Sequence, residues 1–435
     1  MSQLAPFSRP LYVMPKPAGS ACNLVCDYCY YLEKRHLTGG RPQMMSDATL
    51  ESFVRQYIEA QTQDEVLFTW HGGEPLLRPL AFYERAMELQ RRYGRGRHIA
   101  NCLQTNGTLL TPEWCRFLAH NGWLVGVSID GPPALHDAYR HVGGGATAGH
   151  DASGTRPPGS HGSAAKVVAG IRLLQRHGVE WNVMGVVNAL NADHPLEVYA
   201  FYKELGASFI QFTPIVERLH DHADGRHLAE PICSMPATTS GNCAASPLAP
   251  FSVTPSQYAR FLVAVFDEWV LHDVGNVYVQ LFDSTLAAWV GEPPGICTMA
   301  PTCGHALAVE ANGDLYSCDH FVFPAYRLGN ILDTPLTTMA YGARQQAFGR
   351  AKRDGLAAAC RRCRWLFACG GGCPKDRLAG GLNYLCPAYR AFFEHVAPAM
   401  DFMANELRHE RPPANVMAWA ACNMGHASAC RPKES

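Results

Sequence analysis

The chain contains 435 residues, with 37 Lys and Arg against 38 Asp and Glu, and a formal net charge of −1. A protein that binds polyanions without specificity would carry a strong basic excess, so this charge excludes that class. The apolar fraction of 47% is ordinary for a globular protein. The 17 cysteines are too sparse for a small disulfide scaffold and too many for an ordinary enzyme core, so their spacing needs an explanation.

The sequence carries no targeting signal that we can identify. Its N-terminal segment has no apolar run long enough for a signal peptide, and no stretch approaches the ~20 apolar residues of a membrane span. Both absences predict a cytoplasmic protein. A reducing cytosol keeps cysteines as thiols, so we expect clustered cysteines to bind metal rather than to form disulfides.

The first half of the chain alternates short apolar segments, typical of buried parallel strands, with amphipathic ones. Strands are predicted at 11–14, 66–70, 98–104, 123–129, 181–187 and 208–213. Helices are predicted at 47–61 and at 164–177, where apolar residues recur every three or four positions and Gly178 follows as a terminating residue. Six β-α repeats predict a parallel sheet, either open or curved into a partial barrel, with chemistry at the carboxyl ends of the strands.

Composition divides the chain into an α/β part, a helical connection, a cysteine-dense domain and a C-terminal helix with a tail. The predicted parts are 1–254, 255–296, 297–393 and 394–435. Two segments of the α/β part, near 141–163 and 217–254, are irregular and rich in small residues, and we expect them to be flexible insertions. The tail beyond Arg411 is predicted to be poorly ordered.

Cys22, Cys26 and Cys29 lie just after the first predicted strand, in a C-x3-C-x2-C arrangement. Three thiolates on one tight loop suit three irons of a 4Fe–4S cluster, which leaves the fourth iron without a protein ligand and open to a small molecule. A structural zinc site is the alternative. It needs a fourth nearby Cys or His, for which His36 is the nearest candidate.

This motif, with the aromatic residue Tyr28 before its third cysteine, resembles that of the radical S-adenosylmethionine (SAM) enzymes. The resemblance implies a partial (β/α)6 barrel of the TIM type and places Tyr28 in the cofactor site. It also implies that SAM binds the open iron through its amino and carboxylate groups. Electron transfer to the sulfonium then gives a 5′-deoxyadenosyl radical, while the protein supplies position and excludes water.

Three further strand ends carry motifs that match this family. HGGEP follows the second strand, where glycines let the backbone approach a ligand closely, and the resemblance assigns Gly73 to the methionine amino group. VSIDGP ends the fourth strand, and the resemblance assigns Ser128 and Arg140 to the cofactor. A surface salt bridge is the alternative for Arg140. Val216 matches the position beneath the adenine, and its alternative is an apolar core position.

A second group of eight cysteines is enough for two fully ligated 4Fe–4S clusters. The spacings resemble the SPASM extension of radical SAM enzymes that modify peptides and proteins, and that resemblance implies interleaved ligands. It assigns Cys297, Cys303, Cys318 and Cys373 to a nearer auxiliary cluster, and Cys360, Cys363, Cys369 and Cys386 to an outer auxiliary cluster. Two zinc sites would also use eight thiolates, because CRRC and CGGGC are typical of zinc ribbons, but the upstream radical motif favours iron.

Six cysteines have no ligand spacing, and we interpret them as buried or incidental thiols. They are Cys102, Cys115, Cys233, Cys243, Cys422 and Cys430.

Together the motifs cover 16–393 and most closely resemble the anaerobic sulfatase-maturating enzymes. They read KPxGxxCNLxCxYCxY, GGEP, LQTNGTL, VSIDGP and SCDHFV. The resemblance implies that the deoxyadenosyl radical takes a hydrogen from Cβ of a Cys or Ser in a C/S-x-P-x-R-like sulfatase segment, which becomes Cα-formylglycine. Asp319 matches the family's proposed base, and an ordinary turn aspartate is its alternative. Tyr31 and Asp314 are candidates for holding the peptide.

The resemblance also implies a nascent or unfolded sulfatase as partner and a flavodoxin or ferredoxin as electron donor, with no nucleic acid or membrane partner. Two other functions fit parts of the sequence. Another SPASM-type radical SAM enzyme would form thioethers or cross-links in a ribosomal peptide, but such enzymes often carry a recognition module before the barrel, and only a short segment precedes Cys22. A non-catalytic zinc or redox scaffold predicts a colourless protein that does not respond to SAM.

Overall fold

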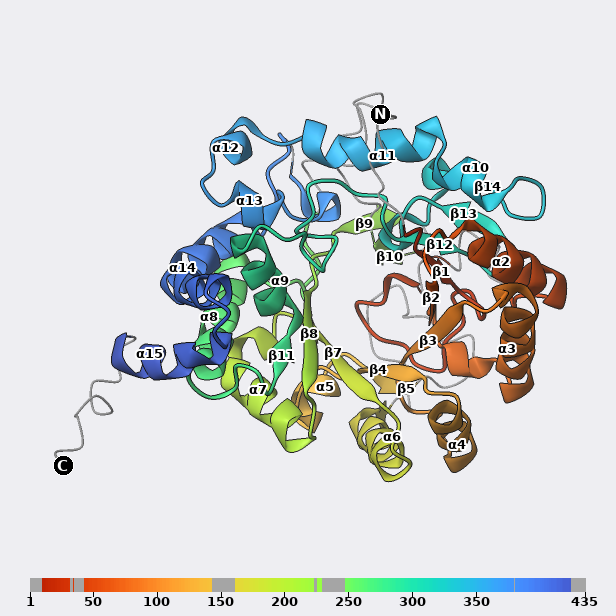
Figure 1. The fold of residues 1–435 in the computed structure, drawn as a ribbon, viewed down its shortest axis with the longest axis horizontal. Helices are drawn as coiled ribbons and strands as arrows, with labels where there is room; N and C mark the ends of the chain where they lie inside the picture. Colours follow the sequence, from red (N-terminus) through yellow and green to blue (C-terminus); the bar gives the residue numbers. More distant parts are fainter. Residues whose placement is uncertain are drawn as a thin grey trace.

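The computed structural model describes residues 10–31, 34, 43–142, 161–222, 225–228, 247–378 and 380–423. Within this part of the chain, six parallel strands form a curved sheet with helices along its outer side (Figure 1). A second sheet of four strands lies beside the β2 end of the first. Buried apolar side chains of both sheets and their helices belong to one continuous core.

The larger sheet has the order β11-β8-β7-β4-β3-β2, and every neighbouring pair is parallel. Its strands are β2 (Glu65–Trp70), β3 (His98–Thr105), β4 (Leu124–Ser128), β7 (Trp181–Val187), β8 (Phe209–Pro214) and β11 (Tyr278–Val279). Five of them lie within one residue of a predicted strand. The sixth, β11, lies in the segment that we predicted to be a helical connection, because two residues are too few to give a periodic signal.

The first predicted strand belongs to the other sheet. β1 (Val13–Pro15) pairs in parallel with β12 (Leu307–Val309), and β13 (Asp314–Tyr316) and β14 (Arg327–Asn330) complete the order β1-β12-β13-β14. Our prediction that this strand opens the barrel sheet was wrong. The buried strand β12 offers it a backbone edge, and periodicity alone does not identify the partner of a strand. The chain therefore enters the first cysteine loop from the sheet of the cysteine-dense domain.

Helices cover the outer side of the curved sheet (Figure 1). They are α2 (Asp47–Ala60), α3 (Leu80–Gly94), α4 (Pro112–His120), α5 (Pro133–His136), α6 (Ala164–Arg176), α7 (Pro195–Glu204), α8 (Pro255–His272) and α9 (Gln280–Trp289). Helices α2 and α6 match the predicted ranges. The side chain of Ser46 caps α2 by accepting from the backbone N–H of Thr49, and Gly178 after α6 has φ of +67°, as a helix-terminating glycine should.

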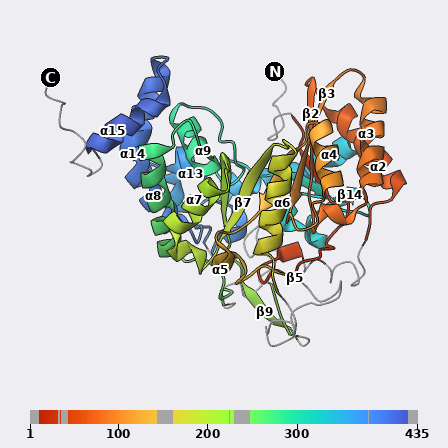
Figure 2. The ribbon, with the colours of Figure 1, turned by 90° about the horizontal axis from the view of Figure 1, so that it is seen from below.

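The C-terminal part is mostly short helices around the cysteines, followed by one long helix. These helices are α10 (Leu336–Ala340), α11 (Ala343–Asp354), α12 (Ala358–Arg361), α13 (Leu366–Cys369), α14 (Cys386–Arg408) and α15 (Val416–Asn423). Figure 2 shows α14 and α15 at the opposite end of the molecule from α2 and α3. None of the described helices combines the length and hydropathy that a bilayer-spanning segment needs.

Two predictions about the C-terminal tail need correction. The tail was predicted to be poorly ordered beyond Arg411, but Val416 and Ala420 of α15 are fully buried and the helix packs on α8. Two apolar anchors one helical turn apart are enough to dock this short helix, although they give only a weak sequence signal. Cys422 is disulfide-bonded, so it is not the incidental thiol that we predicted.

Both predicted insertions are described only in part. The ends of the first form an antiparallel pair, β5 (His141–Val142) with β6 (His161–Gly162). The start of the second forms another, β9 (Leu219–His222) with β10 (Gly225–Leu228). Residues 143–160, 223–224 and 229–246 of these segments, together with Cys233, Cys243 and Cys430, lie outside the described part of the chain.

Candidate active site

The three cysteines of the first motif lie on the loop that follows β1. The N–H of Cys29 donates to the carbonyl of Cys26 at 3.0 Å, which closes the last turn of the loop. The N–H of Val25 donates to the carbonyl of His141 at 2.9 Å, which attaches the loop to the base of the first insertion. The side-chain amide of Asn106, just beyond the end of β3, lies 3.6 Å from the sulfur of Cys22. Three separate segments thus fix the positions of these thiols.

The electrostatics of these thiols fit a positively charged group. Burial raises the pKa of Cys22 to about 12, and negative charge on Glu74 and Cys29 contributes in the same direction. Burial also raises the pKa of Cys26 well above its usual range, and Cys29 and Cys22 add to the shift. A coordinated iron reverses this situation, because a ligating thiol is held as the thiolate. The loop therefore suits the cationic iron–sulfur core of a cluster, and the role of these thiols as the ligand set stays a prediction.

The GGEP segment after β2 contacts the cysteine loop itself. A Cβ on Gly73 would lie 2.1 Å from the carbonyl oxygen of Ala21, so only glycine fits there. The N–H of Gly73 donates to the carbonyl of Gly19 at 2.8 Å, and that of Glu74 donates to Ala21 at 2.7 Å. The close backbone approach that we predicted for this motif is thus made to the residues just before Cys22. The predicted contact between Gly73 and the cofactor remains untested.

Glu74 joins the ends of two strands from a completely buried position. Its carboxylate accepts from the hydroxyl of Thr105 at 2.8 Å and from the backbone N–H of Asn106 at 2.8 Å. Burial raises the pKa of Glu74 to about 7, while the hydrogen bonds from Asn106 and Leu76 oppose the shift. Sequence reasoning found the motif but not this function of the glutamate, because its partners are more than thirty residues away.

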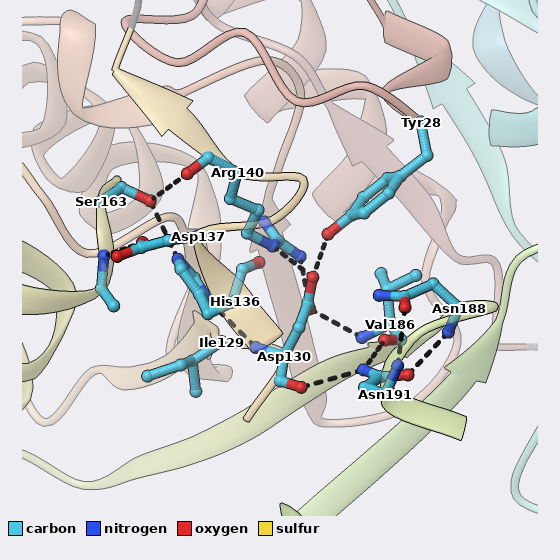
Figure 3. Close-up of polar contacts among 12 residues, drawn as sticks. Tyr28, Ile129, Asp130, His136, Asp137, Arg140, Ser163, Val186, Asn188 and Asn191 are labelled. Carbon is cyan, nitrogen blue, oxygen red and sulfur yellow. Dashed lines mark hydrogen bonds and ion pairs between the residues drawn. The ribbon is translucent and has the colours of Figure 1, made fainter. Parts of the chain in front are cut away.

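Asp130 is the centre of a buried network at the carboxyl end of β4 (Figure 3). Arg140 donates to both carboxylate oxygens, from Nε at 2.9 Å and from Nη2 at 3.1 Å. The hydroxyl of Tyr28 and the backbone N–H of Val186 donate to the same carboxylate. Although burial alone would raise the pKa of Asp130, the charge and hydrogen bonds of Arg140 hold it below its usual value. Two residues predicted to contact the cofactor therefore share one buried carboxylate.

A second layer holds this carboxylate in place (Figure 3). Nδ1 of His136 accepts from the backbone N–H of Asp130 at 3.2 Å, and its Nε2 lies 2.9 Å from the hydroxyl of Ser163. Burial lowers the pKa of His136 to about 4, so the ring is neutral at neutral pH. Asn191 donates to the carbonyls of Asp130 and Val186. Sequence reasoning missed His136 and Asn191 because neither lies in a spaced motif.

The other two predicted cofactor residues lie at strand ends of the same sheet. The hydroxyl of Ser128 accepts from Nε2 of Gln104 at 3.0 Å, between the ends of β4 and β3. Val216 follows β8 with a buried side chain, and its carbonyl accepts from Nζ of Lys375 at 2.7 Å. The structure thus gathers Tyr28, Ser128, Arg140 and Val216 at the carboxyl edge of the sheet, which is where a parallel sheet places a ligand.

Asp319 is buried against the segment that carries the first cysteine loop. It begins a short 3-10 helix after Cys318, and its Oδ2 accepts from the hydroxyls of Tyr30 and Tyr31, each at 2.7 Å. Lys16 forms an ion pair with its Oδ1, and Nζ of Lys34 donates to its backbone carbonyl at 2.7 Å. This carboxylate joins the second cysteine group to the first, although nearly three hundred residues separate the two in sequence.

Burial perturbs every basic group around Asp319. It lowers the pKa of Lys16 well below its usual range, with Lys34 contributing, and it lowers the pKa of Lys34 to about 8. It also lowers the pKa of His71 to about 3, and Nδ1 of that ring lies 3.0 Å from the hydroxyl of Tyr31. Perturbed groups that converge on one carboxylate are typical of proton-transfer sites. Sequence reasoning found Asp319 and Tyr31 but missed both lysines, because a single lysine is most often a surface residue.

The second group of cysteines divides electrostatically into two sets. Burial raises the pKa of Cys318 to about 12, with Cys297 and Cys303 contributing, and it also raises that of Cys373, to which Cys303 and Cys297 again contribute. The thiols that influence Cys369 and Cys386 belong instead to the outer set. The thiols that shift one another's pKa values are thus those that we predicted to share a cluster. The assignment of ligands to clusters stays a prediction.

The described part of the chain contains no preformed site for a single metal ion. Among the described residues, no group of three or more His, Cys, Asp or Glu side chains surrounds one metal position. In a 4Fe–4S cluster each thiolate binds a different iron, so the sulfur atoms need only surround the cluster. Cys102 and Cys115 are free thiols, as we predicted for them; Cys115 lies in the core, and Cys102 on β3 is partly buried.

Comparison with known proteins gives a family for each of the two parts that carry the cysteine groups. Residues 17–202 match the radical SAM superfamily, and residues 297–364 match the SPASM iron–sulfur cluster-binding domain. A serine-type anaerobic sulfatase-maturating enzyme of Bacteroides thetaiotaomicron is 54% identical over 95% of this chain and 96% of its own length. A cysteine-type enzyme of Clostridium perfringens is 32% identical over 92% of this chain and 100% of its own length.

Solved structures of the same family are also similar to this chain. Native anSMEcpe with bound AdoMet and Cp18Cys peptide aligns with a TM-score of 0.74 at 32% identity, over 92% of this chain and all of that one. Streptococcus suis SuiB aligns with a TM-score of 0.54 at 14% identity, over 86% of this chain and 78% of that one, which shows a shared fold alone. The partial radical SAM barrel followed by a SPASM domain is thereby confirmed.

Proposed function

Because this chain belongs to the family of anaerobic sulfatase-maturating enzymes, we propose that it oxidises a Ser or Cys side chain of a sulfatase polypeptide to Cα-formylglycine. The peptide segment resembles C/S-x-P-x-R. For serine, the side chain loses one hydrogen from Cβ, one proton from the hydroxyl and one electron, which leaves an aldehyde. For cysteine, the same losses give a thioaldehyde, which water converts to the aldehyde and hydrogen sulfide.

The two matched domains together indicate SAM and iron–sulfur clusters as cofactors. We propose three 4Fe–4S clusters, one on Cys22, Cys26 and Cys29 and two in the cysteine-dense domain. When bound to the first cluster, SAM supplies the deoxyadenosyl radical that takes hydrogen from the substrate Cβ. Tyr28, Gly73, Ser128, Arg140 and Val216 would form the wall around it. A flavodoxin or ferredoxin would supply the electron that starts each turnover.

The position of Asp319 carries this proposal. Its carboxylate lies between the first cysteine loop and the predicted ligand Cys318, where a substrate Cβ placed near SAM comes within reach of a base. Asp319 takes the proton from the substrate hydroxyl or thiol. The hydroxyls of Tyr30 and Tyr31 and the ammonium of Lys16 hold the carboxylate in place before the substrate arrives, so little reorganisation is needed.

We also propose that serine is a substrate. The relative at 54% identity is serine-type, whereas the cysteine-type relatives are between 27% and 32% identical. Serine is the harder substrate to oxidise, because a hydroxyl proton is less acidic than a thiol proton.

The test uses the full chain, reconstituted without oxygen, with SAM, a reductant and a pair of peptides that differ only in Ser or Cys within the motif. We expect about 12 irons per chain. Mass spectrometry should show loss of two hydrogens from the serine peptide, in step with 5′-deoxyadenosine. A variant with Cys26→Ala is the control and should produce neither. Cleavage of SAM without any peptide change would contradict the sulfatase assignment and favour another SPASM-type peptide-modifying reaction.

A further inference from the structure

One face of α11 is fixed against the loops that carry the predicted ligands of the nearer auxiliary cluster. Gln345, Gly349 and Lys352 lie at positions i, i+4 and i+7 of this helix, so they share a face. The side chains of Gln345 and Lys352 are completely buried. Lysine is almost never fully buried without a partner, so this face needs a physical explanation.

The first two of these residues hold cysteine loops by hydrogen bonds. Nε2 of Gln345 donates to the carbonyl of Ser317, the residue before Cys318, at 3.0 Å. The carbonyl of Gly349 accepts from the backbone N–H of Cys303 at 3.0 Å. Helix α11 therefore contacts the backbone beside two predicted ligands of the nearer auxiliary cluster.

Lys352 adds a positive charge beside a third ligand. Its Nζ donates to the carbonyls of Cys297 and Thr298 at 3.0 and 2.8 Å. Within the part of the chain that the structure describes, it makes no ion pair with a carboxylate. The partners of this ammonium are therefore backbone carbonyls of the loop that carries Cys297, and its charge lies beside that predicted ligand.

Another buried lysine near the same set is arranged differently. Lys375 follows Cys373 by two residues, but its Nζ lies 2.9 Å from Glu217 and 3.1 Å from Asp376. Two carboxylates thus neutralise the charge of Lys375. The charge of Lys352 has no such partner among the described residues and lies beside the predicted cysteine ligands.

We propose that Lys352 raises the reduction potential of the nearer auxiliary cluster and so makes it the acceptor of the substrate electron. A cluster with four thiolates is an anion, and reduction by one electron makes it more negative. A fixed cation in a buried site therefore stabilises the reduced state more than the oxidised state. Lys352 does not touch the substrate; it acts through the cluster.

This inference rests on the proposed function for its electron balance. After the substrate loses a hydrogen atom to the deoxyadenosyl radical and a proton to Asp319, one electron remains to be removed. The nearer cluster, bound in its oxidised form, would accept that electron and be reduced by one. A higher potential of that cluster makes the transfer more favourable.

The experiment measures midpoint potentials and needs no substrate, so it can fail or succeed independently of the sulfatase assignment. The full chain with Cys22, Cys26 and Cys29 changed to Ala is reconstituted, so that the auxiliary clusters alone give signals. The lysine is then changed to Gln, which keeps a hydrogen-bond donor without the charge, or to Arg, which keeps both. Redox titrations followed by electron paramagnetic resonance report each cluster.

For Lys352→Gln we expect the nearer cluster to shift towards the oxidised form by about tenfold, which is about 59 mV for one electron. Lys352→Arg should restore the original potential, and the outer cluster should shift less. Arg353→Gln is the matched control, because Arg353 is the next residue of α11 but is exposed and pairs with Asp354. This variant should leave both potentials unchanged.

Iron content is measured alongside the potentials. An unchanged potential in Lys352→Gln with full iron would mean that the lysine only braces the loop, and the tuning role would be wrong. Loss of the nearer cluster from Lys352→Gln would likewise overturn the proposal, because the lysine would then be an assembly residue. A lowered potential in Lys352→Gln and in Arg353→Gln alike would show a general charge effect and would also contradict it.

Discussion

The molecule contains two buried carboxylates that both contact the first cysteine loop, and they differ in their partners. Asp130 is bound by the two-pronged guanidinium of Arg140, by Tyr28 and by a backbone N–H of β7. Asp319 is bound by tyrosine hydroxyls and by lysine ammonium groups, all from side chains that titrate.

The difference in partners suits Asp130 to a structural role and Asp319 to a reactive one. An Arg–carboxylate pair has fixed geometry and keeps its charges at all working pH values, so Asp130 is suited to holding structure. A carboxylate among Lys and Tyr groups has partners whose own pKa values burial has shifted, so Asp319 is suited to moving protons. Both arrangements use neighbouring residues of one loop, so this loop would align the proposed cofactor residues with the proposed base.

The largest effect is expected from Asp319→Asn, which removes the proposed proton acceptor but keeps the shape of the side chain. Peptide oxidation should fall by about 100-fold or more, the usual contribution of a general base. The rate is measured by mass spectrometry of the peptide under anaerobic conditions. Iron content and binding of SAM should not change. A variant that oxidises peptide at the normal rate would show that Asp319 is not the base.

A smaller loss, in stability rather than in chemistry, is expected from Asp130→Asn. Removal of one partner from a buried ion pair leaves Arg140 uncompensated and costs about 3 kcal/mol. The free energy of unfolding is measured with denaturant for the single variants and for Asp130→Asn combined with Arg140→Met. The double variant should lose less than the sum of the singles, because the two residues interact. Strict additivity would contradict the pairing.

The smallest effect concerns the pH dependence that His136 gives to the free energy of unfolding. In the folded chain burial lowers the pKa of His136 to about 4, whereas in the unfolded chain it is about 6.5. The unfolded chain therefore binds more protons between these values, and stability falls as the pH falls through this window. From pH 7 to 5.5 the loss due to this residue should be about 1 kcal/mol.

His136→Gln should remove this part of the pH dependence. The free energy of unfolding is measured at both pH values in the variant and in the parent chain. A glutamine substitution at His98, an exposed histidine on β3, is the matched control and should keep the parental slope. Equal slopes in all three proteins would mean that His136 is not held neutral by burial.

The sequence predicted most of the parallel sheet, because buried strands such as 181–187 are apolar runs whose signal is local. It failed for β1 and β11. The partner of β1 is nearly three hundred residues away, and β11 has only two residues. Similarly, α15 was missed because two buried residues are enough to dock it on α8, a contact that no local pattern encodes.

For the site, the sequence found residues that lie next to a motif. Asp319 was found because it follows Cys318, and Arg140 because it follows VSIDGP. It did not find that Arg140 is bound to Asp130, nor that Lys16 and Lys34 surround Asp319. Those pairings join different strands and loops, and a lysine gives no sign in sequence of whether it will be buried.

By itself, the sequence determined the inventory of chemical groups: a cysteine set with three members, two sets with four members, and the family that this spacing indicates. The spacing of the first set is readable because one loop carries all three cysteines, so that constraint is local. The tertiary structure alone decided the electrostatics. Pairing β1 with β12 brings the first loop against Asp319, and docking α11 places the charge of Lys352 beside the nearer thiols. Charges act through space, so their effect is fixed only when distant segments are packed together.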